Sequence, residues 1–191
     1  VGFGETLEGM DAVPEARMVT MILIVVGSGT LLYFLSNFTA LIVEGDLQGI
    51  LRARRMQRHI EALDDHVIVC GAGNTGEHVV AELLDADIPF VVIEHDEERI
   101  QMLSDDFGTE LLYIIGDATD DHFLEDAGIE RARGVISCLH TDKDNLFVTV
   151  SARALTLERQ KATPLRIVTK AVDSSAIRKM QRAGASAIVS P

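Results

Sequence analysis

Basic residues are scarce in this sequence. Its 191 residues include 17 Lys and Arg against 30 Asp and Glu, which gives a formal net charge of −13. Proteins that bind nucleic acid present a basic stripe to the phosphates, and the one cluster of arginines here, within residues 52–58, follows directly after a long uncharged run. The composition therefore argues against a nucleic-acid partner.

Cysteine is also rare, with only Cys70 and Cys138 in the chain. Each falls at the end of an expected strand, neither belongs to a CxxC pair, and no paired histidines stand at metal-binding spacing. We expect both thiols to stay reduced in the cytosol and to serve as small buried residues.

Charged residues are absent from positions 18–43. About 20 apolar residues suffice to cross the hydrocarbon of a bilayer, so we predict a transmembrane helix over residues 16–43. A signal peptide is disfavoured because the preceding flank is acidic, the run is too long and no small-residue cleavage site follows. A buried core helix rarely runs so far without a charge. The arginines after the run place the following chain on the cytoplasmic side.

Residues 66–191 alternate short β-branched runs with amphipathic stretches. The expected strands are residues 66–70, 89–94, 111–115, 133–138, 165–170 and 186–189, and the expected helices are residues 74–86, 96–106, 120–127, 142–158 and 173–183. Strands as uniformly apolar as these belong to a parallel sheet that is buried on both faces and joined by right-handed crossovers. The predicted fold is α/β, a doubly wound parallel sheet.

A glycine-rich turn follows the first expected strand and has the pattern G-x-G-x-x-G. In such a turn the first glycine permits the tight bend, the second lets a pyrophosphate approach the backbone, and the third lets helix and strand pack closely. The anion then faces the N–H groups and the positive dipole end of the following helix. The predicted cofactor-binding turn consists of Gly71, Ala72, Gly73, Asn74, Thr75 and Gly76.

Glu94 ends the second expected strand, where a dinucleotide fold carries an acidic residue. A carboxylate there accepts hydrogen bonds from both ribose hydroxyls and repels a 2′-phosphate, which disfavours NADP. The alternative is a solvated carboxylate at a strand end. Arg99, one turn into the next expected helix, either reaches a phosphate or pairs with Glu98 or Glu94.

The segment GDAT, residues 116–119, follows the third expected strand, where the adenine edge of a nucleotide would lie. Asp117 is a candidate to accept a hydrogen bond from the adenine amino group, to cap the helix that begins near Asp120, or to do both. Ala118 beside it completes the predicted cofactor-binding set.

No dehydrogenase machinery accompanies these motifs. Of the six histidines only His140 falls near the carboxyl edge of the expected sheet, and it has neither an obvious orienting partner nor a second domain to hold a substrate. We therefore expect a protein that binds a nucleotide without being an enzyme. A membrane-anchored oxidoreductase that uses NAD remains the alternative.

The opening segment VGFGE, residues 1–5, resembles the selectivity filter of tetrameric potassium channels, whose usual form is TVGYGD. On this resemblance, the main-chain carbonyls of Val1, Gly2, Phe3 and Gly4 would coordinate potassium, in backbone conformations that glycine reaches without steric cost. Phe3 stands in place of the usual tyrosine. The preceding threonine, the pore helix and the outer helix are missing, so the chain is not expected to be a whole pore subunit.

The remainder is similar to the regulator-of-potassium-conductance (RCK) domain, which is also found in potassium-uptake regulators. VIVCGAGNTGEHVVAELL, VVIEHDEERI, GDAT, GVISCLHTDKDN and RAGASAIVSP occur in that family's order and spacing. The resemblance implies a prokaryotic RCK-gated channel of the cell membrane, multi-pass in its complete form, with a homotetrameric pore and a ring of cytoplasmic RCK domains. NAD or another adenine nucleotide would regulate it, and potassium would be the permeant ion. If VGFGE were accidental, the chain would instead be a regulatory subunit of a potassium uptake system.

The same resemblance divides the chain into four parts. They are the filter end and outer loop (residues 1–15), the inner pore-lining helix (16–43), a gating linker (44–65) and the nucleotide-binding domain (66–191). Within the inner helix, the segment GSG at residues 27–29 indicates either a hinge or close helix packing. Phe34, Leu35 and Phe38 would form an apolar constriction that closes by dewetting, or would face lipid.

Calcium is not expected at the family's archetypal site. The calcium-gated member has carboxylates at positions that hold Cys138, Lys170 and Val172 here. Other acidic residues, Asp142, Asp144 and Asp173, stand at the starts of expected helices. They either form a different ion site or act as partners of the helix dipoles.

Overall fold

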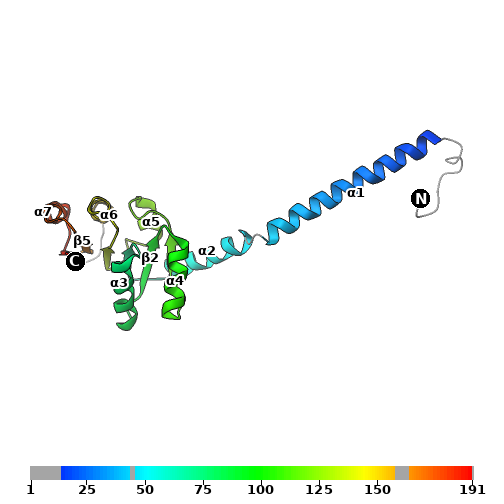
Figure 1. Cartoon of the computed structure of the whole chain (residues 1–191). Coiled ribbons are helices and arrows are strands. Elements are labelled where there is room, and N and C mark those ends of the chain that lie inside the picture. Colours follow the sequence, from blue (N-terminus) through cyan, green and yellow to red (C-terminus); the bar gives the residue numbers. More distant parts are fainter. Residues whose placement is uncertain (1–13, 44–45, 158–163, 191) are drawn as a thin grey trace. The chain divides into compact units, whose positions relative to one another are not determined.

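The computed structural model describes residues 14–43, 46–157 and 164–190. The chain divides into two units, Val1–Arg52 and Ala53–Pro191, each of which is described by itself (Figure 1). Val1, Gly2, Phe3 and Gly4, the predicted potassium ligands, lie outside the described residues.

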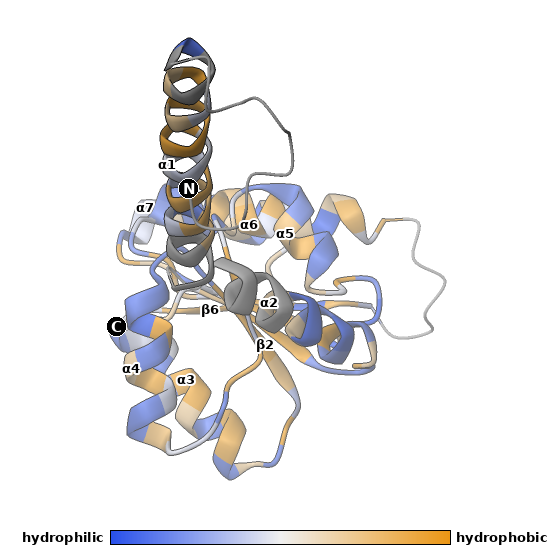
Figure 2. Cartoon of the chain, turned by 90° about the vertical axis from the view of Figure 1, so that its right-hand side faces the viewer, coloured by the Kyte–Doolittle hydropathy of each residue, from blue (hydrophilic) through white to orange (hydrophobic). Residues whose placement is uncertain are grey.

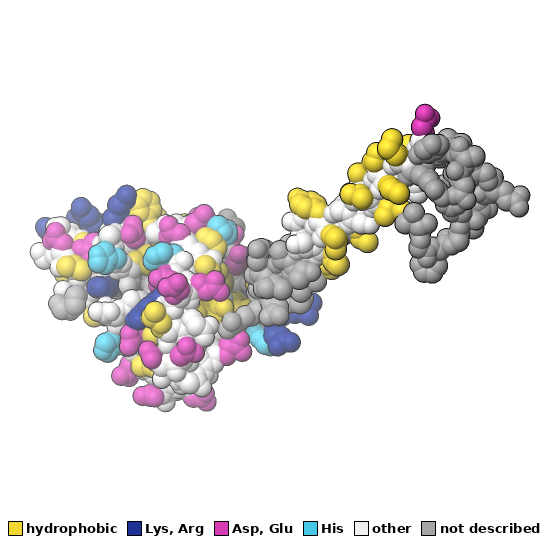
Figure 3. All heavy atoms as spheres, turned by 45° about the vertical axis from the view of Figure 1, so that its right-hand side comes forward, with side chains coloured by type: hydrophobic (Ala, Val, Ile, Leu, Met, Phe, Trp, Pro, Cys, Tyr) yellow, Lys and Arg dark blue, Asp and Glu magenta, His cyan; other side chains and the backbone are white. Residues whose placement is uncertain are grey.

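The first unit contains one long helix, α1 (Pro14–Val43). Its segment Met18–Phe38 is long and apolar enough to cross a membrane by length and composition, and none of that segment is buried inside the structure. Exposed apolar residues occur at consecutive positions of α1, as in residues 21–26 and 31–35, and so cover every side of the helix. Figure 2 shows the helix coloured by hydropathy, and Figure 3 shows apolar side chains on one of its faces. A helix that is hydrophobic on every side needs an apolar environment on every side, and α1 is not a core helix of the described structure.

Polar side chains within α1 bond to the backbone of the same helix. Thr30 Oγ1 donates to the Val26 carbonyl at 2.8 Å, and Asn37 Nδ2 donates to the Tyr33 carbonyl at 2.9 Å. Such bonds to the residue four positions earlier satisfy polar groups where water is absent. The helix continues through the GSG segment, where a Cβ added at Gly27 or Gly29 would have open space around it.

A second helix, α2 (Asp46–Glu61), occupies most of the segment expected as a linker. Its last residues belong to the second unit, where Met56 and Ile60 are buried in the core. These two residues stand four positions apart and so share one helix face. The sequence analysis used the arginines of this segment only as a signal of membrane topology and did not predict the helix.

The second unit is built on a parallel sheet of six strands in the order β3-β2-β1-β4-β5-β6. The strands are β1 (Val67–Cys70), β2 (Phe90–Glu94), β3 (Tyr113–Ile115), β4 (Gly134–Ser137), β5 (Arg166–Lys170) and β6 (Ala187–Val189). Each lies within its predicted range. The order is that of a doubly wound dinucleotide fold, so the predicted fold class is confirmed. It reverses between β1 and β4, where Val67 pairs with Phe90 on one side and with Gly134 on the other.

Helices cover both faces of the sheet (Figure 1). They are α3 (Asn74–Asp85), α4 (Glu97–Phe107), α5 (Asp121–Asp126), α6 (Asp142–Leu155) and α7 (Ser174–Ala183). Alternate residues of β1 point to opposite faces: Val69 packs in the cluster formed with α3 and α4, and Ile68 packs in the cluster formed with α2, α5 and α6. Burial on both faces explains why the strands are apolar throughout.

Candidate nucleotide-binding site

The glycine-rich turn between β1 and α3 owes its shape to two of its glycines. Gly71 has φ of +93°, and a Cβ added there would lie 3.2 Å from the Cys138 carbonyl oxygen. A Cβ added at Gly76 would lie 2.0 Å from the Gly71 carbonyl oxygen, closer than any real contact allows. The first glycine therefore supplies a left-handed conformation, and the third lets α3 start directly against the turn.

Gly73, between them, has a different environment. It is exposed, and a Cβ added there would have nothing within 4 Å. It is the N-cap residue of α3 and gives that helix no side-chain cap. The following four helices are each capped by a side chain, from Asp96, Asp120, Thr141 and Asp173. The first turn of α3, with Asn74 and Thr75, thus presents N–H groups beside an open surface, which is the arrangement that receives an anion at a helix N-terminus.

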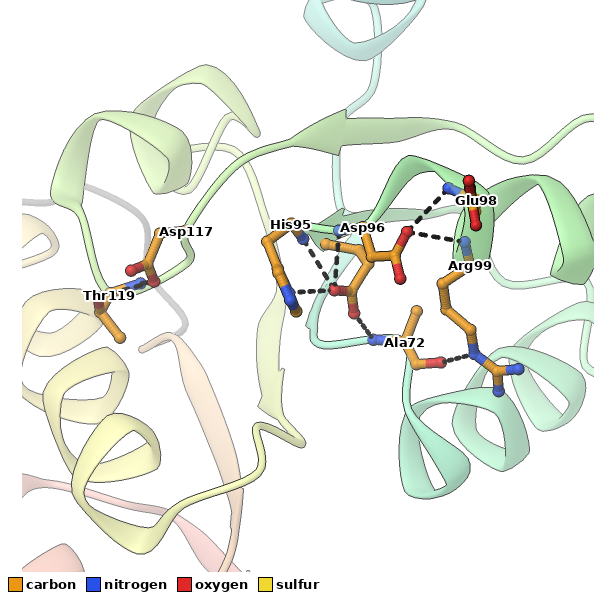
Figure 4. Close-up of polar contacts among 8 residues, drawn as sticks. Ala72, His95, Asp96, Glu98, Arg99, Asp117 and Thr119 are labelled. Atoms are coloured by element: carbon orange, nitrogen blue, oxygen red, sulfur yellow. Dashed lines mark hydrogen bonds and ion pairs between the residues drawn. The ribbon is translucent and has the colours of Figure 1, made fainter.

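Glu94, the last residue of β2, turns its carboxylate onto this glycine-rich turn. Figure 4 labels Ala72, His95 and Asp96, whose N–H groups bond to that carboxylate. Oε2 accepts from the Ala72 N–H at 2.6 Å, and Oε1 accepts from the N–H groups of His95 at 2.8 Å and Asp96 at 3.2 Å. His95 Nδ1 lies 2.5 Å from Oε1. The side chain is only 7% exposed, so the alternative of a solvated strand-end carboxylate is wrong.

Arg99 ties the start of α4 to the same turn. Its Nε donates to the Ala72 carbonyl at 2.8 Å, and its Nη2 pairs with Glu77 Oε2 at 2.5 Å. The alternatives of pairing with Glu98 or Glu94 are therefore wrong. Glu77 lies in the first turn of α3, so Arg99 is held at the edge of the anion-accepting helix start, with its side chain 27% exposed.

Asp117 folds back onto its own loop after β3. Its Oδ1 accepts from both the N–H and the hydroxyl of Thr119, at 2.9 and 2.8 Å. The cap of α5 is instead Asp120, which accepts from the His122 N–H, and hydrogen bonds from His122 lower the pKa of Asp120. Because both bonds of Asp117 use Oδ1, its other oxygen can accept a hydrogen bond from a ligand. Ala118 beside it is buried.

A cavity of about 320 Å³ lies at the carboxyl ends of β2, β3 and β4, with β1 between β2 and β4 in the sheet. It is lined by residues 93–95 at the end of β2, by residues 116–119 after β3, by Leu139 and His140 after β4, and by Asp144 of α6. The cavity therefore brings together Glu94, Asp117 and Ala118 of the predicted set. The glycine-rich turn and Arg99 are not among its walls; they meet the site through the contacts of Ala72 with Glu94 and Arg99.

Sequence reasoning missed several of these walls. His95, Gly116, Thr119, Leu139 and Asp144 were not assigned to the site, and His140 was noted only for its position. Gly116 and Thr119 lie in the GDAT segment, which was expected at the adenine edge, but neither residue was given a role there. The remaining signal was position, because all of these residues follow the carboxyl ends of parallel strands, where ligands of open α/β sheets bind.

Asn145 is a further residue that the motifs did not reveal. It is buried in α6, and its Oδ1 accepts from the Ser137 hydroxyl at 2.7 Å and from the Leu139 N–H at 2.8 Å, while its Nδ2 donates to the Leu139 carbonyl at 3.2 Å. These bonds fix the loop after β4. Asn145 therefore positions the Leu139 wall of the cavity without lining it.

The two cysteines are buried beneath this edge and are free of disulfides. Burial raises the pKa of the Cys138 thiol to about 11, and nearby Lys170 opposes part of the rise. The pKa of Cys70 is raised further, by burial and by the neighbouring Cys138 thiol. Both thiols are therefore protonated at neutral pH, and thiols in that form are poor nucleophiles and poor metal ligands.

The acidic residues at the helix starts have backbone and hydroxyl partners. Asp142 accepts from the N–H groups of Val172 and Asp173, Asp173 accepts from the Ser175 N–H, and Asp144 accepts from the Thr141 hydroxyl. Within residues 14–43, 46–157 and 164–190, no group of three or more His, Cys, Asp or Glu could hold a metal ion. The partners of these carboxylates favour a structural role over an ion site.

Comparison with known proteins shows which family the second unit belongs to. The model of the TrkA-N domain matches residues 67–191. The chain belongs to the TrkA-N domain family. Two relatives come from Methanocaldococcus jannaschii: the probable potassium channel protein 2, 35% identical over 92% of this chain and 49% of its own length, and potassium channel protein 1, 34% identical over 100% of this chain and 54% of its own length. The chain thus spans about half the length of these relatives.

Solved structures of GsuK are also similar to this TrkA-N chain. The structure of GsuK bound to ADP is 28% identical, with a TM-score of 0.54 over 72% of this chain and 34% of that one. The GsuK channel bound to NAD is 20% identical, with a TM-score of 0.56 over 67% of this chain and 22% of that one, and supports the fold alone.

Proposed function

We propose that this chain is the gating part of a potassium channel subunit, in which an adenine nucleotide, NAD or another, binds the TrkA-N domain and alters the opening of the pore. The observation that carries the proposal is the joined arrangement of Glu94, Ala72 and an uncapped α3 start beside a cavity. It provides a carboxylate for a ribose and N–H groups for phosphates. The relatives that are potassium channel proteins, and the ADP-bound GsuK structure, support the same assignment.

The four expected parts of the chain become roles in this proposal. Residues 1–15 provide the filter end, with potassium held by the main chain of residues 1–4; residues 16–43 line the pore; residues 44–65 transmit the movement; and residues 66–191 bind the nucleotide. The length and apolar character of α1 support the second role. Four copies would surround one pore in the cell membrane, with their TrkA-N domains in a cytoplasmic ring.

A chain of contacts leads from the cavity toward the pore helix. The wall formed by residues 116–119 is followed directly by α5, and the carbonyl of Asp126 at the end of α5 accepts from Gln57 Nε2 of α2 at 3.2 Å. Arg131 also donates to carbonyls near the end of α2, those of Leu63 at 3.1 Å and Ile60 at 3.4 Å. Since α2 follows α1 in the chain, a displacement of α5 on binding would be carried toward the pore helix.

Binding can move the gate only if the nucleotide has different affinities for the open and closed states. The test is potassium flux and single-channel recording of the full-length protein in liposomes, with and without ADP or NAD. We expect nucleotide to change the open probability, and Glu94→Ala or Gly73→Asp to abolish that change while potassium permeation remains. Identical responses in wild type and both variants would refute the coupling.

The full-length protein in liposomes also distinguishes a channel from an NAD-dependent oxidoreductase. Reduced nicotinamide supplied with candidate substrates should keep its absorbance, because a regulatory ligand is not consumed. Turnover of the nicotinamide together with a lack of potassium permeability under every ligand condition would overturn the proposed function.

A further inference from the structure

The carboxyl edge of the sheet holds a cavity at the ends of β2, β3 and β4. The cavity walls come from the loops after β2, β3 and β4, and from Asp144 in the first turn of α6. Glu94 borders this space from the side of β2, and His140 borders it from the side of β4. No residue of β5, β6 or α7 contributes to these walls.

Asp142 joins the two loops that follow β4 and β5. Its Oδ1 accepts from the Val172 N–H at 2.8 Å, and its Oδ2 accepts from the Asp173 N–H at 2.8 Å. Asp142 is the first residue of α6, after β4, and its two donors follow β5. The carboxylate therefore joins the two segments across the carboxyl ends of β4 and β5; we call this the Asp142 clasp.

Both partners of the clasp are themselves held in place. The side chain of Asp173 caps α7 through the Ser175 N–H at 2.8 Å. Ala171, immediately before the clasp, donates its N–H to the Val189 carbonyl of β6 at 2.9 Å. Opening the clasp would therefore disturb the cap of α7 and the hydrogen bond between Ala171 and Val189 of β6.

A dinucleotide fold consists of two mononucleotide-binding halves, and the ligand crosses from one to the other where the strand order reverses. That reversal lies between β1 and β4 here. The first nucleoside would lie in the cavity beside Glu94. The second would lie over β4 and β5, where Asp142 joins the loops.

We infer that the site of this chain takes an adenine mononucleotide and excludes the second nucleoside of a dinucleotide. The inference rests on the proposed nucleotide site and specifies its ligand. The cavity volume of about 320 Å³ agrees with it, because it stands at the lower end of the roughly 300–1,000 Å³ range of small-molecule sites. The phosphates of a mononucleotide would lie toward the glycine-rich turn, outside the clasp.

The experiment measures the affinities of AMP, ADP, ADP-ribose and NAD for the purified full-length protein in detergent by calorimetry. ADP-ribose differs from ADP by a second ribose esterified to the β-phosphate, which also lowers the charge of that phosphate. Each ligand is therefore compared between the wild type and the Asp142 variants, so that the charge difference cancels. We expect ADP to bind, and ADP-ribose and NAD to bind at least about tenfold more weakly, a difference of about 1.4 kcal/mol. Equal affinities for ADP and NAD would overturn this inference and leave the proposed function intact. A lack of binding by all four would overturn both.

Two substitutions test whether the clasp causes the exclusion. Asp142→Ala removes both acceptors, and we expect it to raise the affinity for NAD toward that for ADP while the affinity for ADP stays within about twofold. The control is Asp121→Ala, which removes an exposed aspartate from the first turn of α5 without touching the edge between β4 and β5. It should leave the ratio of the two affinities unchanged.

A milder variant guards against loss of folding. Asp142→Asn retains one acceptor and places an amide group opposite one of the two backbone donors, so we expect an intermediate ratio of affinities. If Asp142→Ala fails to bind ADP, the test relies on Asp142→Asn, whose ratio of ADP affinity to NAD affinity is compared with that of the wild type. A ratio equal to that of the wild type in every variant that binds ADP would overturn the role of the clasp.

Discussion

The carboxylate of Glu94 accepts a hydrogen bond from the main-chain N–H of Ala72 at 2.6 Å. This bond joins the acidic residue at the end of β2 to the middle of the glycine-rich turn, two elements that the motif analysis assigned separately to ribose and phosphate. A nucleotide that engaged the Glu94 carboxylate as proposed would therefore also act on the glycine-rich turn. We expect the proposed site to respond as one unit, so that substitutions in either element affect the other.

Glu94→Gln tests this unit. A glutamine keeps one acceptor oxygen but places an NH₂ group against N–H donors that the carboxylate now satisfies. Because Glu94 is 7% exposed, we expect a loss of about 1–3 kcal/mol in the free energy of unfolding and at least about tenfold weaker nucleotide binding. Urea denaturation and calorimetry measure the two effects. Glu97→Gln, an exposed change in the first turn of α4, should alter neither, and a Glu94→Gln variant with normal affinity would contradict the assigned role.

Gly76 and Gly73 have opposite surroundings, crowded and open, so alanine substitutions at the two positions form a matched pair. Gly76→Ala places a methyl group 2.0 Å from the Gly71 carbonyl oxygen, so we expect a loss of about 1–3 kcal/mol of stability from overpacking. Gly73→Ala meets nothing within 4 Å, but alanine is a poorer N-cap than glycine, so we expect a stability loss of at most about 1 kcal/mol. It should nevertheless weaken nucleotide binding, because the methyl group stands where phosphates approach the backbone.

Thermal or urea unfolding and ADP titration distinguish the two variants. The expected pattern is an unstable Gly76→Ala protein and a stable Gly73→Ala protein with low affinity. If Gly73→Ala bound ADP as tightly as wild type, the phosphates would not approach the turn at this residue.

Because Cys70 and Cys138 are buried, we expect the free energy of unfolding to fall at alkaline pH. The pKa of Cys138 is raised to about 11 in the folded protein, and the pKa of Cys70 is raised as well. The unfolded chain releases these protons near the ordinary thiol pKa, about 8.5, while the folded chain keeps them. Stability from the protonated thiols is therefore complete below that pH and falls as the pH rises from there toward 11, by up to roughly 1.4 kcal/mol per pH unit for each thiol.

Urea denaturation at pH 7, 9 and 10 measures this slope. Lysines and tyrosines also titrate in alkali, so the comparison is between wild type and a Cys70→Ala/Cys138→Ala double variant, which should lose less stability over the same interval. Equal slopes in the two proteins would show that the thiols ionise freely in the folded state.

Gln57 provides a test of transmission that leaves the nucleotide site unchanged. Gln57→Ala removes the bond from α2 to the Asp126 carbonyl of α5. We expect unchanged ADP affinity but a smaller effect of ADP on the open probability, because the site and the pore helix become less strongly coupled. Gln101→Ala, which removes an exposed bond to Asp105 within α4, is the control. A full response in Gln57→Ala would exclude this contact from the route.

Within residues 66–191 the sequence alone determined the elements and their order along the chain, whereas α2 was not predicted. Strands that are apolar on both faces and separated by amphipathic helices can bury their side chains in a parallel sheet with helices on both faces. The uncharged run of residues 18–43 likewise predicted a long apolar helix, which α1 is. The glycines could be assigned in advance because each role, a left-handed φ, an open approach or close packing, is a local property of the backbone.

Only the tertiary structure decided which side chains meet. Glu77 is the partner of Arg99, Asp120 rather than Asp117 caps α5, Asn145 fixes the loop after β4, and Asp142 bonds to the loop after β5. These pairings join residues from different elements or depend on how a loop turns. A linear pattern records the spacing of residues along one element, whereas contacts between elements depend on the twist, packing and loop paths of the folded chain. The ligand that the edge can hold is therefore a property of the fold.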